Sequence, residues 1–286
     1  MIRINQIKDC PVTVEDVDVS LNIWGKNIVA LKVKTTRSKP NTVARDSVKI
    51  AVDLLKLHKE VFLTLDIFFV NNIPFLLTLS RIICFTAVNN LVNRMVPQIS
   101  AAFKEIYQYY LHRGFHITTM HSDGEFAPFQ DLIESLPGIP MINLESANEH
   151  IPRIKLKIRV VKEPCRSTRH SLPFQHIPKL LTIHILFQTE KLHNILPTKG
   201  GLYDTLSPKT IMSGDILEYK KHLSLQIGQY CQVHEEYAPH NSHNLRTKGA
   251  IFLGTSGNLQ GGFKFMALST GKKKIGVIGM LSKCQI

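Results

Sequence analysis

The stretch VFLTLDIFFV, residues 61–70, is the part of the sequence that is most informative about the fold. β-Branched and aromatic residues dominate it, so it predicts a buried strand, and Asp66 is its single acidic residue. The pair Asn71-Asn72 and a second apolar run at about Phe75–Ser80 follow, which predicts a hairpin. Residues 82–87 are expected to form or extend a third strand. The chain therefore opens its sheet with an antiparallel meander.

The pattern then changes from strand to helix and back. Apolar residues recur at intervals of three and four from Val92 to His112, which predicts an amphipathic helix that ends at Gly114. Residues 115–120 predict a short strand, and Asp123 follows at its carboxyl end, where open α/β sheets carry functional residues. Strands, a helix, a strand and further helices predict an α/β core with a mixed sheet.

The remainder predicts helices and then a β-rich unit. Helices are expected at 131–136, from Pro152 to about Cys165, at 177–196 and within LSPKTIMSG (206–214). IGQYCQVHEE, GAIFLGTSG and GGFKFMALSTGKK are typical of short strands with Gly and Asn turns, as in a small barrel-like unit. The expected organisation is an N-terminal remnant and basic linker (1–55), a core (56–200), and a helical connector with a small β-barrel-like region (201–286).

Asp66 and Asp123 are the candidate catalytic residues. An unpaired carboxylate inside an apolar strand costs roughly several kcal/mol, so a metal, a nearby Lys or a backbone hydrogen bond must compensate Asp66. Asp123 before Gly124 is also compatible with a simple turn. Because a hairpin, a helix and a returning strand separate them, both carboxylates are expected at one edge of the sheet. There they would hold a divalent metal, Mg²⁺ or Mn²⁺.

The positive charge of the chain is concentrated in two windows. The formal net charge is +13. Residues 153–200 hold ten Lys or Arg against two acids (net +8), and residues 26–49 hold seven against one (net +6). Clustered positive charge is typical of proteins that bind nucleic acid, and a merely soluble basic surface is the alternative.

One row of cations lies within the first of these windows. Lys155, Arg159, Lys162 and Arg166 fall at i, i+4, i+7 and i+11 of the helix expected from Pro152, so they share a face. The row predicts a surface that follows DNA phosphates, and a solvated helix face is the alternative reading.

Several function classes lack their motifs. The five cysteines (Cys10, Cys84, Cys165, Cys231 and Cys284) show no CxxC or other metal spacing, so no zinc site or disulfide scaffold is expected. His112, His116 and His121 do not share a face and are interpreted as solvated or core-edge residues. P-loop, GxGxxG, GxSxG and HExxH motifs are absent. No secretory signal or apolar membrane span is visible, which predicts an intracellular protein, nuclear or cytoplasmic, with no membrane partner.

An ordered series of segments resembles a known family. The chain is similar, over roughly residues 8–274, to the integrase region of copia-type LTR retrotransposon polyproteins. The segments are LTLDIFFVNNIPFLLTLSR, TMHSDGEF, NEHIPRIKLKIRVVKE, LSPKTIMSG and GAIFLGTSGNLQGGFKFMALSTGK. The resemblance implies an RNase H-like core whose three acidic residues (DDE) bind two divalent metals, followed by a small β-rich unit. It implies Asp66 as the first carboxylate and Asp123 as the second.

The third carboxylate of this pattern is missing. Lys155 stands where the resemblance implies Glu, so metal attraction becomes repulsion of roughly 4 kcal/mol per unit-charge pair at about 4 Å and an effective dielectric of ~20. Glu149 and Glu163 are the nearby acids, and neither reaches the same point without rearrangement. A lost or impaired second metal is therefore expected. Only Cys10 could remain of the family's zinc module, so no zinc is predicted, and the sequence after Lys274 departs as in a truncated or frameshifted copy.

Three hypotheses follow from these residues. The first is an integrase-type domain of a mobile element, acting in DNA integration by polynucleotidyl transfer, with impaired catalysis and a homo-oligomer as a further expectation. The second is a catalytically dead DNA-binding remnant. The third is a relic without a selected role, which would fold poorly.

Overall fold

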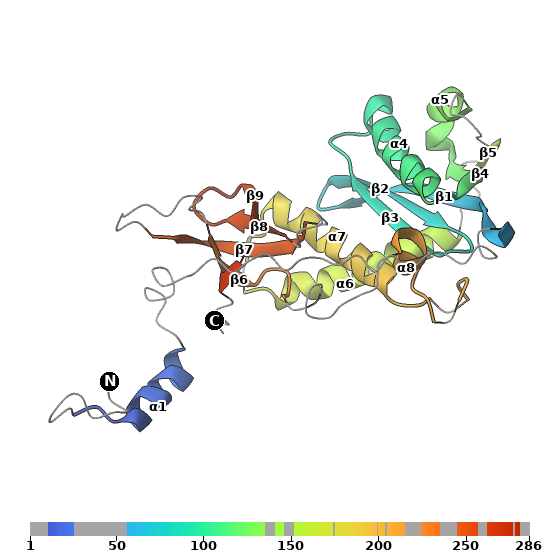
Figure 1. Cartoon of the computed structure of the whole chain (residues 1–286). Coiled ribbons are helices and arrows are strands. Elements are labelled where there is room, and N and C mark those ends of the chain that lie inside the picture. The colour runs from blue at the N-terminus through green and yellow to red at the C-terminus, as the bar shows by residue number, and fades with distance from the viewer. Residues whose placement is uncertain are drawn as a thin grey trace. The chain divides into compact units, whose positions relative to one another are not determined.

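The computed structural model describes residues 11–25, 56–134, 141–145, 152–214 except 174, 199 and 204, residue 223, and 225–234, 245–256 and 262–280 except 277. The basic window at 26–49 and Glu149 lie outside these residues. The chain divides into two compact units, one of Ala44–His222 and one of Met1–Val43 with Leu223–Ile286 (Figure 1).

The first unit is built on a mixed five-stranded sheet. Its strands are β1 (Glu60–Val70), β2 (Ile73–Ser80), β3 (Thr86–Asn90), β4 (His116–Asp123) and β5 (Met141–Glu145). The strand order is β3-β2-β1-β4-β5. β1, β2 and β3 pair antiparallel, whereas β4 runs parallel to β1 and β5 runs parallel to β4. The predicted meander and α/β class are confirmed, and the arrangement is that of an RNase H-like core.

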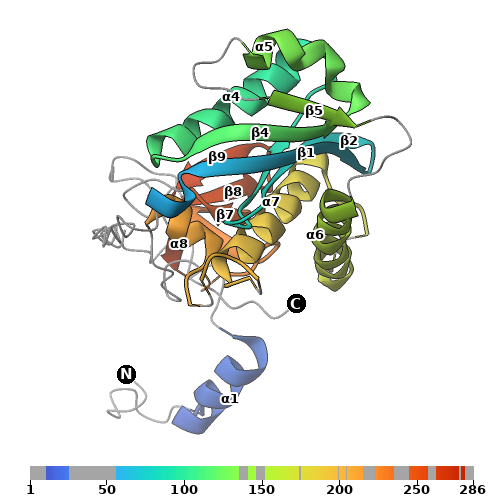
Figure 2. The same ribbon diagram turned by 90° about the vertical axis from the view of Figure 1, so that its right-hand side faces the viewer.

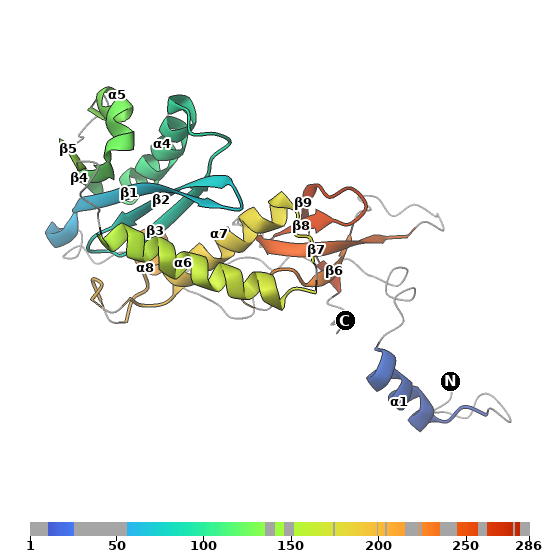
Figure 3. The ribbon, with the colours of Figure 1, turned by 180° about the vertical axis from the view of Figure 1, so that it is seen from behind.

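Helices cover both faces of this sheet. α4 (Val96–His112) lies on one face, and α6 (Pro152–Ser171) and α7 (Lys179–Ile195) lie side by side on the other (Figures 1 and 2). Between β4 and β5 come η2 (Gly124–Phe129) and α5 (Gln130–Glu134), and α8 (Pro208–Ser213) follows α7. Figure 3 shows α6 from behind, where it lies under the sheet beside α7.

The side chains of β1 point alternately to the two faces of the sheet, one covered by α4 and the other by α6 and α7. Leu63 and Leu65 are almost fully buried in the cluster that includes Phe103 and Tyr110 of α4. Successive residues of a strand point to opposite faces, so Thr64, Asp66 and Phe68 face α6 and α7. The Lys162 Nζ of α6 lies 5.4 Å from the centroid of the Phe68 ring, in agreement with this assignment.

The tight hairpin of β1 and β2 comes from its two asparagines. Val70 pairs with Ile73, so Asn71 and Asn72 alone form the turn. Their φ angles of 48° and 61° are positive, a conformation that Asn tolerates better than other residues with a Cβ. The predicted turn is confirmed, and it fixes the register that places Asp66 opposite Leu77.

Some predicted boundaries are wrong. The third strand is Thr86–Asn90 rather than 82–87, because Arg81, Ile83 and Cys84 turn the chain and Cys84 has a φ of 58°. In that turn the Phe85 N–H donates to the Ser80 Oγ at 3.0 Å. The fourth strand runs on through Asp123, and the strand β5 was not predicted.

The predicted helix of residues 92–112 begins only at Val96. The Met95 N–H donates to the Asn93 side chain at 3.1 Å before the helix, and Pro97 occupies its first turn. Gly114 ends it with a φ of 83°, as predicted.

α6 extends beyond its predicted end at Cys165, to Ser171, although Pro164 lies inside it. Proline has no N–H, so Pro164 cannot donate to the Val160 carbonyl one turn earlier. The His193 ring of α7 lies in that place, with its Nε2 3.2 Å from the Val160 oxygen. A carbonyl only accepts, so His193 donates from Nε2, and the neighbouring helix compensates the missing bond.

Within the expected N-terminal remnant and basic linker (1–55), the described part contains α1 (Val14–Trp24), which was not predicted. Thr13 caps this helix. Its Oγ1 accepts from the Asp16 N–H at 3.2 Å, and the Asp16 carboxylate accepts from the Thr13 N–H at 2.8 Å.

The second unit contains a separate antiparallel sheet. Its strands are β6 (Tyr230–His234), β7 (Thr247–Thr255), β8 (Phe263–Ala267), β9 (Lys273–Gly276) and β10 (Ile278–Met280), in the order β10-β6-β7-β8-β9. Cys231, Phe252 and Phe265 are almost fully buried at its centre. The predicted small β-rich unit is confirmed as this sheet. No described helix is long and apolar enough to cross a membrane.

Candidate carboxylate site and nucleic-acid interface

Asp66 and Asp123 lie on neighbouring parallel strands. β1 and β4 pair in register up to Leu65 and Ser122, and the next residues along the two strands are Asp66 and Asp123. Side chains at matching positions of a parallel pair share a face, so both carboxylates belong to the face on which α6 packs. Asp123 also caps η2, because its Oδ1 accepts from the Gly124 N–H at 3.0 Å. It is therefore both a strand-end carboxylate and a turn residue.

The environment of Asp66 is unfavourable for negative charge. Burial raises the pKa of this carboxyl group, and the charges of Asp123 and Glu125 raise it further. A hydrogen bond from the Ile67 backbone and the positive charge of Lys155 lower the same pKa. Asp66, Asp123 and Lys155 thus lie close enough to form one electrostatic cluster.

Lys155 is the cation of this cluster. It lies at the end of the first turn of α6, and α6 packs against β1 and β2. It therefore reaches Asp66 from the layer next to the sheet. A metal ligand would donate electron pairs from this position, whereas an ammonium group only donates protons.

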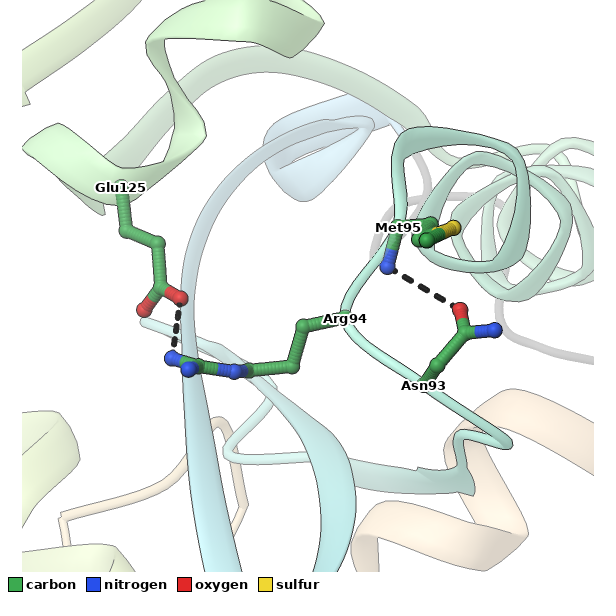
Figure 4. A network of polar contacts seen from close by, with 4 residues as sticks. All are labelled: Asn93, Arg94, Met95 and Glu125. Carbon is green, nitrogen blue, oxygen red and sulfur yellow. Dashed lines mark hydrogen bonds and ion pairs between the residues drawn. The ribbon is translucent and has the colours of Figure 1, made fainter.

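Glu125 extends the acidic cluster and has its own cation. Its Oε1 lies 2.8 Å from the Arg94 Nη1, and both side chains are about half exposed (Figure 4). Arg94 follows β3, whereas Glu125 belongs to η2. The Arg94 guanidinium also lies 5.4 Å from the centroid of the Phe69 ring on β1. This ion pair was not predicted from the sequence, although Glu125 lies only two residues after Asp123.

The row of cations follows α6 away from the carboxylates. Ile154, Ile158, Val161 and Cys165 are the buried face of α6. Lys155, Arg159 and Arg166 are exposed, and Lys162 is half-buried. Burial lowers the pKa of Lys162, the charge of Arg166 lowers it too, and Asp66 opposes both effects. Lys162 is therefore close enough to interact with Asp66 at one end and with Arg166 at the other.

The structure shows neither Glu163 nor Glu149 at the place expected for the third carboxylate. The Glu163 Oε1 lies 2.9 Å from the Arg159 Nε one turn earlier, and both side chains are largely exposed. This ion pair holds Glu163 on the outer surface of α6. Glu149 lies outside the described residues.

The donor set does not fit a pair of divalent metals. Within the described ranges, no group of three or more His, Cys, Asp or Glu side chains could hold a metal ion. Two hard cations near Asp66 and Asp123 would need a further carboxylate, and Lys155 would repel them instead.

His121, interpreted from the sequence as a solvated or core-edge residue, is partly buried in the sheet. On β4 it pairs with Thr64 and Asn143, and its Nε2 lies 3.1 Å from the Asn143 Nδ2. Its ring contacts Phe62 with centroids 4.4 Å apart. Because 121 and 123 have the same parity, His121 shares a face with Asp123. It forms part of the polar strip beside the carboxylates.

The chain was compared with families, curated proteins and solved structures. The chain is similar to a crystal structure of the catalytic core domain of BIV integrase, with a TM-score of 0.38 and 12% sequence identity, over 53% of this chain and 92% of that chain. No family model matches the chain, and no curated protein matches it.

Proposed function

We propose that the chain is a nucleic-acid-binding domain of the integrase type, from a retrotransposon, which holds DNA along α6 and in which Lys155 impairs polynucleotidyl transfer. The observation that carries the proposal is the charge of α6. The helix holds seven Lys or Arg against the single acid Glu163, a net of +6, while its apolar face packs on the core.

The geometry of the row suits a DNA backbone. Lys155 and Arg166 are eleven residues apart, about 17 Å along the helix axis, which matches roughly five phosphates of one strand at about 3.4 Å each. Binding would release condensed counterions, so the affinity would fall steeply with salt. Arg159 is partly neutralised by Glu163, so Lys155, Lys162 and Arg166 would supply most of the attraction.

Asp66 and Asp123 are proposed as the former catalytic pair. They keep the register and the face that such a pair needs, but Lys155 is set among them. In this proposal a divalent metal, Mg²⁺ or Mn²⁺, would act on DNA only where the third position is a carboxylate. The chain would accordingly work where nucleic acid is found, in the nucleus or the cytoplasm.

The second candidate is a DNA-binding remnant with no catalytic activity at all. The ammonium group of Lys155 beside Asp66 favours it, since this cation competes with any metal for the same carboxylate. Traces of strand cleavage separate an impaired enzyme from a dead one.

The proposal is tested by titrating a fluorescent 20-base-pair duplex with the full chain at several salt concentrations and following anisotropy. We expect log K to fall linearly with log salt, with a slope of about −3 to −4 for three or four phosphate contacts. The same duplex incubated in Mn²⁺ should show little or no nicking. Binding that is absent, or that does not depend on salt, would overturn the proposal.

A further inference from the structure

We infer that the ammonium group of Lys155 is a built-in replacement for a divalent metal, which neutralises Asp66 and Asp123 so that the core folds, and binds a phosphate beside them, without Mg²⁺. The part that concerns phosphate rests on the proposed function. The part that concerns folding does not.

The acids of the cluster are Asp66, Asp123 and Glu125. Asp66 and Asp123 are in matching positions on adjacent parallel strands, and Glu125 is close enough to add its negative charge at Asp66. Like charges gathered on a half-buried face repel one another, and such groups are tolerated when a cation compensates them.

The cations Lys155 and Lys162 both belong to α6, which packs on β1. Lys162 Nζ lies over Phe68, which is two residues beyond Asp66 on the same face of β1. Lys155 lies seven residues before Lys162, about two helical turns, so both extend from the same side of α6. Both ammonium groups therefore extend from the side of α6 that contacts Phe68, and Asp66 interacts electrostatically with both.

The third acid of the cluster has a cation of its own. Glu125 is paired with Arg94 at 2.8 Å, so this carboxylate also has an internal cation. Asp66 and Glu125 thus each have a Lys or Arg of the chain itself as a partner. Because the cations are covalently fixed, they cannot be removed by a chelator.

The consequence for binding follows from charge. Bare carboxylates would repel a DNA phosphate, and in a metal-dependent site the metal reverses that repulsion. Here Lys155 adds a positive charge at the same place, and it begins the row that continues to Arg166. The row can therefore hold phosphates from its first residue onward in the absence of metal.

The folding part is tested on the full chain without nucleic acid. Thermal unfolding is followed in EDTA, in Mg²⁺ and in Mn²⁺ for the native chain, Lys155→Gln, Lys155→Glu and the control Arg169→Glu. Arg169 is exposed on the same helix, about 21 Å along the axis from Lys155, so the control has the same charge reversal away from the carboxylates.

We expect the native melting temperature to be the same in all three solutions. Lys155→Gln should melt about 2–4 °C lower than the native chain in EDTA, because the acids lose their cation. Lys155→Glu should melt lower still, and it should regain about 3–6 °C when metal is present at about ten times its dissociation constant. Arg169→Glu should not respond to metal.

Two results would overturn the folding part. One is a native chain that metal stabilises by several degrees, with the gain lost in Asp66→Asn. The other is a Lys155→Gln chain that melts like the native one in EDTA. If Lys155→Glu does not fold even in Mn²⁺, the melting temperature of Lys155→Gln in EDTA alone tests the folding part of the inference.

The binding part is tested with the fluorescent duplex in EDTA and in Mg²⁺ at constant ionic strength. The native affinity should be equal in both, and that of Lys155→Glu should fall about tenfold in EDTA and recover in Mg²⁺. A native chain that binds only with Mg²⁺ contradicts the inference. A chain that binds in neither solution contradicts the proposed function, while the melting experiment still stands.

Discussion

The carboxylate of Asp66 on β1 interacts with the ammonium group of Lys155 on α6, and this attraction opposes the burial that raises the pKa of Asp66. A half-buried carboxylate beside two other acids needs a positive charge to stabilise it. Either a bound metal ion or an internal ion pair can supply that charge. The position of Lys155 favours the ion pair. The proposed binding of DNA through α6 requires no metal at these carboxylates.

Reversing the charge of Arg166 should weaken DNA binding without affecting the fold. Arg166 is exposed and lies at the far end of the row from the carboxylates. We expect Arg166→Glu to lower the affinity about tenfold, for all duplex sequences alike, and to reduce the salt slope by about 1. Lys104→Glu on the exposed side of α4, across the sheet from α6, is the matched control. Equal losses for the two variants would place the DNA elsewhere.

Pro164 and His193 should be energetically coupled. The His193 ring donates to the Val160 carbonyl that Pro164 cannot reach as a donor. We expect His193→Phe to cost about 1–2 kcal/mol in the native background and clearly less in a Pro164→Ala background, where the introduced alanine supplies an N–H. Urea unfolding of the four chains of this cycle gives the coupling. Strict additivity would mean that the ring does not compensate the proline.

Glu190 should make the core less stable as the pH rises. Burial raises its pKa to about 8 from an ordinary 4.5, against the opposing effects of the Asn194 side chain and of Lys209, Lys191 and Lys157. Between these two values the folded chain keeps a proton that the unfolded chain releases, so stability falls from about pH 4.5 to about pH 8 and then levels off.

Glu190→Gln should remove this slope. We expect it to be about as stable as the native chain at pH 4 and about 1–3 kcal/mol more stable at pH 9, less than the full shift implies because the side chain is partly exposed. Urea unfolding across this pH range checks the expectation. Glu163→Gln, an exposed acid on α6, should keep the native slope.

Asn194 should be essential for the attachment of α7 to the edge strand β3. Its Oδ1 accepts from the Thr86 N–H at 2.9 Å, and its Nδ2 donates to the Thr86 carbonyl at 2.6 Å. Both residues are buried, so Asn194→Ala leaves two backbone groups unpaired and should cost about 2–4 kcal/mol. Gln188→Ala on the same helix should cost little. A loss below about 0.5 kcal/mol for Asn194→Ala would show that water replaces the amide.

The first strands, and the position of Asp123 at the end of a strand, could be predicted because their signals are local. The Asn71-Asn72 turn defines the hairpin, and the position of Asp123 after an apolar run places it at a strand end. α1 was missed because valines at 12, 14, 17 and 19 resemble a strand period, although the Thr13 to Asp16 capping box is visible in the sequence. β5 is only five residues long, too short for a reliable pattern.

Other features depend on contacts that no local pattern contains. α6 continues past Pro164 because His193 from another helix replaces the missing donor. Arg94 and Glu125 meet only after β4 returns beside β1. The departure at Lys155 was visible in the sequence, but its interaction with Asp66 depends on the packing of α6 against β1.

The most direct test of the role of Lys155 is a DNA nicking and strand-transfer assay in Mn²⁺ with the native chain, Lys155→Glu, Asp66→Asn and the double variant Asp66→Asn/Lys155→Glu. We expect only Lys155→Glu to be active, because it alone has a carboxylate at residue 155 together with Asp66 and Asp123. A native chain that already cleaves DNA, and loses that activity in Asp66→Asn, would contradict the account and would show that an acid other than residue 155 completes the site.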